Sequence, residues 1–390
     1  MIKLSFGNLF AYVSLFCCVS FFPLFNVDIQ PYFIFCSLLF LFSVNKIKIP
    51  FEIYLILLAC LASSVLLLID ITTFGFNLMS LQKWSKYIVL LVSTVTFYQY
   101  LRIYPLPIKQ IKGFIYVATI VAIIQVIFDK RFFDFFLYRI ATDESRGVTS
   151  VFPEPTYYGM YCLMLMVLLQ QFKYQRKDLY ILLIFNILIL AQSSQAILFL
   201  FVWGIVKSYF ALDKKWKVIL VSSGLLFTYF AELIFSRLNS LFDIRFTALL
   251  VRLNFADLAQ ILILDQSISE RVSNIILPIY WSATNFFYPH GYYQWHVNVE
   301  NYDNELIEFS SIGGGMIMSA FGSVIFEIGM FSFPFIYLFF KLNFKISEDS
   351  VIFIVMFSLV FLSSFQLTIP LYALLLAFNI QKAERLRQLL

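Results

Sequence analysis

The sequence predicts an all-α fold: a polytopic integral membrane helix bundle of about 12 transmembrane helices, with a helical periplasmic cap from two long external loops. Hydrophobic residues make up 61% of the 390 residues, charged residues only 13%, and the mean hydropathy is +0.85. Apolar runs long enough for a hydrocarbon core of about 30 Å recur along the chain. These runs are continuous rather than alternating, which favours spanning helices over a β-barrel.

The predicted spans follow one another closely, apart from two longer gaps. In the first half they are 10–25, 31–44, 53–69, 87–98, 114–128 and 156–172, and in the second half 179–190, 196–212, 218–235, 316–340, 351–365 and 369–380. The gaps, 129–155 and 236–312, are the predicted external loops of one membrane domain, 1–390. The first loop is expected to contain an interfacial helix, since Phe132, Phe133 and Phe136 share one helical face.

Lysine and arginine residues indicate the orientation, because they prefer cytoplasmic loops. With the N-terminus inside, 18 of the 28 basic residues are cytoplasmic, and both termini lie in the cytoplasm. The net charge of +5 follows largely from this bias, so no nucleic-acid partner is implied. The cytoplasmic basic residues are Lys3, Lys46, Lys48, Arg102, Lys109, Lys112, Lys173, Arg176, Lys177, Lys207, Lys214, Lys215, Lys217, Lys341, Lys345, Lys382, Arg385 and Arg387.

The stretch SRGVTSVFPEPTYYGMYC, residues 145–162, places charge and proline between two apolar runs. A residue before proline is held extended, so Phe152 and Glu154 are both fixed. Pro155 suits the first turn of a helix, which puts Glu154 at the N-cap of the sixth span. The Glu154 carboxylate is therefore interpreted either as a helix cap or as a catalytic acid or base.

Arg146 and Arg271 lie in the two predicted external loops. A guanidinium group matches phosphate oxygens in pairs, so the two arginines could together hold a diphosphate. The alternative is that each arginine is simply solvated or extends its charge to the membrane surface.

Aromatic residues gather between 280 and 302, among polar residues. Trp281, Tyr292 and Trp295 are candidates for stacking on sugar faces, although an aromatic belt at the membrane interface would have the same composition. The two histidines of the chain, His290 and His296, lie in this segment and are candidate bases, with ordinary loop residues as the favoured alternative.

Metal and cofactor motifs are absent from the sequence. There is no phosphate-binding glycine-rich loop and no metal motif built from histidine and glutamate. The five cysteines lie in or beside apolar runs without metal-like spacing. We therefore expect no cofactor, no metal and no disulfide.

These motifs resemble the O-antigen polymerase (Wzy) family, which is related to the O-antigen ligases. The stretch 145–162 carries most of the resemblance, through Arg146, Gly147, Phe152, Glu154, Pro155 and Gly159. Three other segments are similar to family segments: LILAQSSQAILFLF at a serine-rich turn, SISERVSNIILPIYW in the large loop, and SAFGSVIFEIGMFSF in a late Glu-x-Gly span. Gln195 stands where many relatives have a basic residue, and no histidine precedes the Glu-x-Gly segment as it does in the ligases.

The resemblance implies a glycosyltransferase of the bacterial inner membrane that needs no metal. It would join undecaprenyl-pyrophosphate-linked oligosaccharide repeat units at the periplasmic face, in contact with membrane lipid. Arg146 and Arg271 would offset the charge of the leaving diphosphate, and Glu154 leads the histidines as the base. A chain-length regulator protein is a further partner that the resemblance allows. The alternatives are a flippase or exporter of the same lipid-linked sugars, and an O-antigen ligase.

Overall fold

A computed structural model of the protein describes residues 6–17, 32–133, 142, 146–174, 176–213, 215, 217, 266–302, 309, 311–312, 317–342, 348–362 and 367–388. These residues form helices, turns and loops with no strand among them, which confirms the predicted all-α class. The helices are α1 (Phe6–Phe16), α2 (Tyr32–Ser43), α3 (Phe51–Phe74), α4 (Leu78–Ile103), α5 (Ile108–Ile127), α6 (Pro155–Gln171), α7 (Lys177–Phe185), the π-helix η2 (Asn186–Ala191), α8 (Ser194–Ala211), α12 (Gln266–Thr284), α13 (Gln294–Glu300), α14 (Ala320–Ile328), the 3-10 helix η3 (Gly329–Ser332), α15 (Phe333–Leu342), α16 (Glu348–Leu362) and α17 (Pro370–Gln388).

Four helical segments in the described part of the chain are long and apolar enough to cross a membrane. They are Phe51–Phe74, Ile108–Ile127, Ser194–Ala211 and Ala320–Leu338. Other apolar helices are shorter, such as α2 with 12 residues and α6 with 17. The structure therefore has the character of a helical membrane protein. The count of about 12 spans stays a prediction, and the expected span 218–235 lies outside the described residues.

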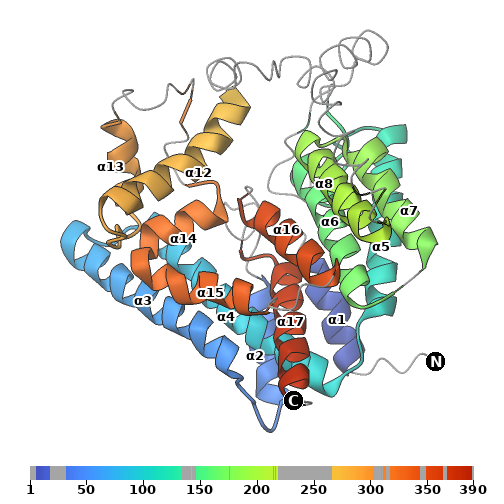
Figure 1. Ribbon diagram of the computed structural model, residues 1–390, viewed down its shortest axis with the longest axis horizontal. Helices are drawn as coiled ribbons and strands as arrows, with labels where there is room; N and C mark the ends of the chain where they lie inside the picture. Colours follow the sequence, from blue (N-terminus) through green and yellow to red (C-terminus); the bar gives the residue numbers. More distant parts are fainter. Residues whose placement is uncertain are drawn as a thin grey trace.

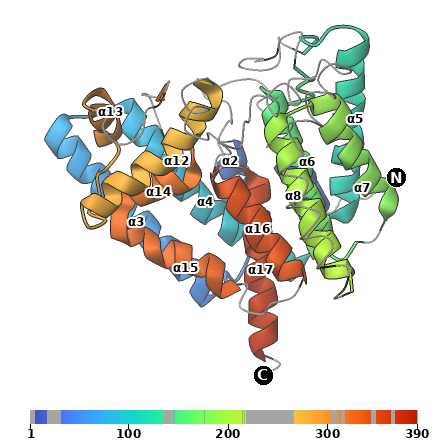
Figure 2. The same ribbon diagram turned by 45° about the horizontal axis from the view of Figure 1, so that its top comes forward.

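Helix α6 is surrounded by other helices. Nearly all of its 17 residues are buried, as expected for a helix that is apolar on every side. It packs against α5, α7, η2, α8, α16 and α17. In both ribbon views α5–α8 stand together on one side, α3, α12, α14 and α15 stand on the other, and α4, α16 and α17 lie between them (Figures 1 and 2).

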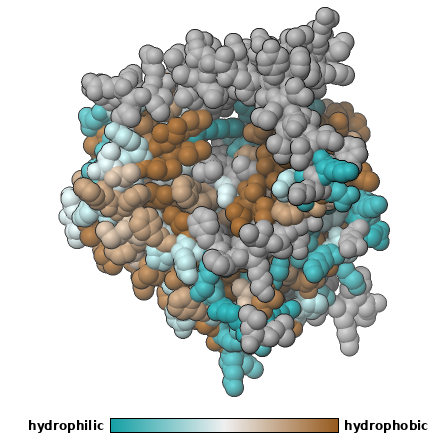
Figure 3. Space-filling model, in the orientation of Figure 1, coloured by the Kyte–Doolittle hydropathy of each residue, from teal (hydrophilic) through white to brown (hydrophobic). Residues whose placement is uncertain are grey.

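Several segments that the sequence places in the cytoplasm meet at one end of the molecule. Lys48 pairs with Glu384 at 2.5 Å, and the buried Glu52 lies 2.6 Å from the Arg387 guanidinium and 3.8 Å from the Lys341 ammonium. Figure 3 shows hydrophilic residues at this lower end and a largely hydrophobic middle. The grouping of these segments agrees with the predicted topology, whereas the side of the membrane that this end faces stays a prediction.

The two predicted external loops are described only in part. In the first, residues 130–133 form a turn, and most of the expected interfacial helix lies outside the described residues. In the second, 236–265, 303–308 and 310 lie outside them, and the remainder contains α12 and α13.

Candidate functional site

Gly147 lies directly against the end of the π-helix η2. The Val148 amide donates to the Leu190 carbonyl oxygen at 2.8 Å. A Cβ atom added at Gly147 would lie 2.2 Å from the Ala191 oxygen and 2.3 Å from the Leu190 oxygen. A π-helix widens the backbone turn and is frequent at functional sites. Only glycine therefore allows the Arg146–Gly147 segment to pack against these carbonyl groups.

Replacing Gly147 by alanine is expected to disrupt the site, because its methyl group would meet two backbone oxygens that cannot rotate away. Gly204→Ala is the matched control, since Gly204 lies within α8 and has no atom within 4 Å of an added Cβ. Gly147→Ala should lower the free energy of unfolding in detergent by about 1–3 kcal/mol, whereas Gly204→Ala should leave it equal or slightly higher. Equal stability of the two variants would contradict the observed packing.

The chain after Gly147 is fixed by buried hydrogen bonds to α5. Ser150 has a positive φ of 54°, a backbone conformation that residues other than glycine rarely adopt. Its amide donates to Gln125 Oε1 at 2.6 Å, and its hydroxyl donates to the Ala118 carbonyl at 2.7 Å. Gln125 Nε2 donates in return to the Ser150 carbonyl at 3.0 Å. Because such strain persists only where the surroundings enforce it, this segment is rigidly held.

Glu154 is the N-cap residue of α6, as the sequence predicts. Its backbone is extended, with φ −142° and ψ 150°, and Pro155 occupies the first helical position. However, the Glu154 side chain makes no capping hydrogen bond to the amides of α6. The residue is partly exposed. The cap interpretation therefore lacks the bond that would make it stabilising.

The serine-rich turn between η2 and α8 packs on the first turns of α6. Gln192 has a left-handed conformation with φ 46°, and the Ser193 hydroxyl caps α8 by accepting from the Ala196 amide at 3.4 Å. A Cβ atom at Gly159 would lie 2.6 Å from Ala196 Cβ and 3.5 Å from Ser193 Cβ. The turn is thus held next to the segment that carries Glu154.

Arg271 reaches the same turn from α12. Its Nη1 donates to Gln195 Oε1 at 3.4 Å, although 76 residues separate the two in sequence. On the other side of the turn, Lys130 Nζ donates to the Arg146 carbonyl at 2.5 Å. The predicted diphosphate residues Arg146 and Arg271 therefore both lie at segments that contact the stretch 190–196. Lys130 is a third cation there, contributed by the first predicted external loop.

The candidate sugar-stacking residues lie mostly inside the protein. Trp295 and Tyr292 are each 1% exposed. Trp295 packs against Trp281 and Phe326, with ring centroids 5.3 and 5.6 Å apart, and the Tyr292 hydroxyl donates to the Ser63 carbonyl at 3.0 Å. Protein atoms cover the faces of both buried rings, so we do not carry Trp295 and Tyr292 forward as sugar-stacking residues.

The two histidines differ in their surroundings. His296 is exposed and lies 3.1 Å from Glu300 on α13. The His290 ring is partly buried and stacks on Phe326, with ring centroids 4.3 Å apart. Phe326 also lies beside Trp281, ten residues beyond Arg271 on α12 and therefore about 15 Å along the helix. The structure does not bring His290 next to Arg271.

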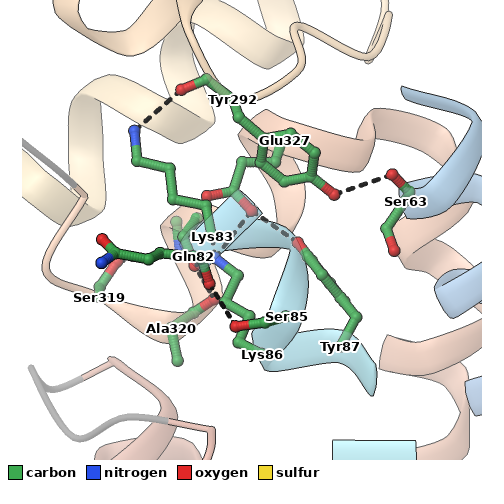
Figure 4. Close-up of polar contacts among 12 residues, drawn as sticks. Ser63, Gln82, Lys83, Ser85, Lys86, Tyr87, Tyr292, Ser319, Ala320 and Glu327 are labelled. Carbon is green, nitrogen blue, oxygen red and sulfur yellow. Dashed lines mark hydrogen bonds and ion pairs between the residues drawn. The ribbon is translucent and has the colours of Figure 1, made fainter. Parts of the chain in front are cut away.

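An ion pair between α4 and α14 forms a polar centre that sequence reasoning missed (Figure 4). Lys86 Nζ lies 2.7 Å from Glu327 Oε2 and donates to the Ser323 hydroxyl at 3.0 Å. The Tyr87 hydroxyl donates to Glu327 Oε2 at 2.8 Å. The side chain of Glu327 is only 4% exposed. Charges inside apolar helices are rare and mark functional or structural centres, which is the signal that could have identified this pair.

A second set of contacts joins this centre to the loop before α13. Lys83 Nζ donates to the Tyr292 carbonyl at 2.9 Å, and the Tyr292 amide donates to Asp70 Oδ2 at 2.7 Å. Gly291 has a φ of 73°, and an added Cβ would lie 2.5 Å from Asp70 Oδ1. The loop is therefore fixed to both α3 and α4.

Removing one partner of the buried ion pair is expected to destabilise the protein. Lys86→Met should lower the free energy of unfolding in detergent by about 2 kcal/mol, because Glu327 would lose its cation while remaining buried. Combining it with Glu327→Leu should recover part of the loss, since no buried charge then remains. Arg176→Ala, at the exposed pair with Asp178, is the control and should have no measurable effect. Unchanged stability of Lys86→Met would contradict a structural role for the pair.

Taken together, the fold and the site define a helical protein of membrane character with cationic residues from separate segments around one turn. Comparisons with models of known protein families, with curated proteins and with solved structures find no match.

Proposed function

We propose that the protein is a polymerase that joins oligosaccharide units carried on a lipid diphosphate, at the periplasmic face of the bacterial inner membrane. In this reaction a hydroxyl oxygen of the acceptor sugar bonds to the anomeric carbon of the donor glycan. The bond from that carbon to the diphosphate breaks, and the diphosphate leaves with the electron pair. The hydroxyl proton passes to a base of the protein. The proposal assigns the diphosphate to Arg146 and Arg271, and the proton to Glu154.

The proposal rests on one observation: three segments that are separate in sequence contact one another at the turn between η2 and α8. Gly147 contacts the carbonyl groups of Leu190 and Ala191, Gly159 contacts the turn that follows them, and Arg271 contacts Gln195 in that same turn. These are the segments that resemble the polymerase family. Scattered similarities in unrelated positions would not be expected to converge on one turn.

The charges around this turn suit a diphosphate leaving group. Guanidinium groups bind pairs of oxygens, and fixed donors stabilise charge that develops in a transition state. Lys130, held against the Arg146 backbone, adds a point charge from the first loop. The rigid packing of 147–152 keeps this part of the site in place before the substrate binds.

An exporter of the same lipid-linked sugars is the second candidate, because of the polar centre at Glu327. Transporters bind substrates on interrupted helices deep in the membrane. The candidate span Ala320–Leu338 is interrupted at Gly329, where φ is 55°, immediately after the buried ion pair of Glu327 with Lys86. The contacts of Arg271 and Gly147 favour the polymerase, whereas this interruption favours the exporter.

The surface glycan of a deletion strain separates these functions. A strain without the polymerase should display lipid A-core capped by a single repeat unit. A strain without an exporter should display no repeat unit, and one without a ligase should accumulate long polymer on the lipid carrier. Either of these last two patterns would overturn the proposed function.

A further inference from the structure

The loop between α12 and α13 pairs with the middle of a candidate membrane span. The His290 amide donates to the Phe326 carbonyl and the Gly291 amide to the Glu327 carbonyl, each at 3.1 Å. In return the Met330 amide donates to the Phe287 carbonyl at 2.8 Å. Residues 326–330 are central in the 19-residue candidate span Ala320–Leu338. The loop therefore lies at the depth of the span's interruption, not beyond its end.

A contact with α3 shows that one side chain of the loop reaches the middle of a second candidate span. The Tyr292 side chain runs along α3 from Asp70, which accepts its amide, to Ser63, which accepts its hydroxyl. Ser63 lies near the middle of the 24-residue candidate span Phe51–Phe74. It is 11 residues from the end of that span, or about 16 Å along the helix, roughly half of a hydrocarbon core.

The backbone of the loop is suited to an environment without water. Each amide from Asn285 to Tyr292 donates within the protein, and Pro289 has no amide hydrogen. The acceptors are the carbonyl oxygens of Trp281, Ala283, Ser282, Asn285, Phe326 and Glu327 and the carboxylate of Asp70. Irregular backbone can lie at membrane depth only when its polar groups are paired in this way.

Among the exposed side chains of the loop, Asn285 pairs its amide with the Trp281 carbonyl and the His290 ring, whereas Phe286 and Tyr288 are aromatic. Phe286 is 90% exposed and Tyr288 is 69% exposed. Phe286 and Phe287 both have positive φ, 53° and 54°. This conformation is unfavourable for residues with a Cβ atom. The Phe287 ring is held against Phe333 with centroids 5.1 Å apart, so the strained backbone directs the Phe286 ring outward. Exposure of a phenyl ring to water is unfavourable, whereas the same ring is well solvated in lipid.

The loop also joins the apolar surface of α3, through the residue Tyr293. Tyr293 stacks on Phe74 with ring centroids 5.0 Å apart and an interplanar angle of 25°. Phe74, the last residue of that candidate span, and Phe76, two residues beyond it, are themselves 49% and 70% exposed. A bilayer that surrounds α3 would therefore also contact Tyr293 and this part of the loop.

We propose that residues 285–293 form a re-entrant element of the membrane domain, in which Phe286 and Tyr288 contact the acyl chains and interface of the bilayer. This inference does not depend on the proposed function. It differs from the expectation that the whole of 236–312 is an external loop, and it extends the interpretation as an aromatic membrane belt to these exposed rings.

The test uses the full-length protein in phosphatidylcholine vesicles, with an environment-sensitive fluorescent amino acid at position 286 and, in a second variant, at position 288. Position 300 is the control, because the Glu300 side chain on α13 is 64% exposed. Lipids brominated on their acyl chains should quench the fluorescence at 286 and 288 by about twofold or more and leave position 300 unchanged, as expected for side chains at the lipid boundary. Quenching of 286 and 288 by aqueous iodide, without quenching by brominated lipid, would overturn the proposal.

Discussion

Replacing Arg271 by alanine is expected to abolish the polymerised glycan. If Arg271 stabilises the departing diphosphate, its loss should slow the reaction roughly 10²- to 10³-fold, which is typical for removal of one donor to a developing charge. Arg271→Lys should fail as well, since lysine keeps the charge but cannot bind two oxygens side by side. Membranes with matched amounts of each variant should be blotted for surface glycan, and the ladder of long chains should be missing.

Two comparisons make the Arg271 result specific. Arg176→Ala, at an exposed pair with Asp178, should keep the full ladder. If Arg146 and Arg271 bind one diphosphate together, the double alanine variant should be little worse than either single variant, because residues that act as a unit are not additive. A normal ladder from Arg271→Ala would show that Arg271 does not stabilise the departing diphosphate.

Glu154→Gln is expected to cause a loss of similar or greater size. Glutamine keeps the size of the side chain but cannot accept the hydroxyl proton, and a positioned base contributes about 10²- to 10⁴-fold. The fold should be retained, because glutamine matches glutamate in size and keeps an oxygen acceptor at the same place, and no capping bond to α6 depends on the carboxylate. The glycan ladder should therefore disappear at normal protein abundance and with unchanged thermal unfolding in detergent.

Glu300→Gln is the control for this substitution. Glu300 is an exposed carboxylate whose partner is His296, and its replacement should leave the ladder intact. Full-length glycan from Glu154→Gln would show that Glu154 is not the base. A loss of protein from the membrane, without loss of activity per molecule, would instead indicate a structural role.

The local features of the candidate site could be predicted from the sequence, because proline restricts the backbone wherever it occurs. The extended Glu154 and the helix start at Pro155 follow from this restriction. The contact of Arg271 with Gln195 could not be predicted, since it depends on how α12 packs rather than on nearby residues. The burial of Trp295 could not be predicted either, because composition does not show which aromatic rings are covered by protein.

The helical class followed from apolar composition, but the details of single helices did not. The apolar run 179–190 predicts one span, whereas the structure divides it into α7 and a π-helix that ends at Ala191. Periodicity cannot distinguish these forms in a run that is apolar on every side. The rule for cytoplasmic loops considers Lys83 and Lys86 only as charges, and it does not indicate that Lys86 is paired with another helix.

The separation of the paired charges along the chain also has a consequence for synthesis of the protein. Lys86 precedes Glu327 by 241 residues, and Lys48 precedes Glu384 by 336. At about 5–20 residues per second, Lys86 leaves the ribosome roughly 10–50 s before its partner exists. An unpaired ammonium group is costly to hold in hydrocarbon. The part of α4 that carries Lys86 must therefore remain hydrated during this interval, and its packing into the bundle has to await the arrival of α14.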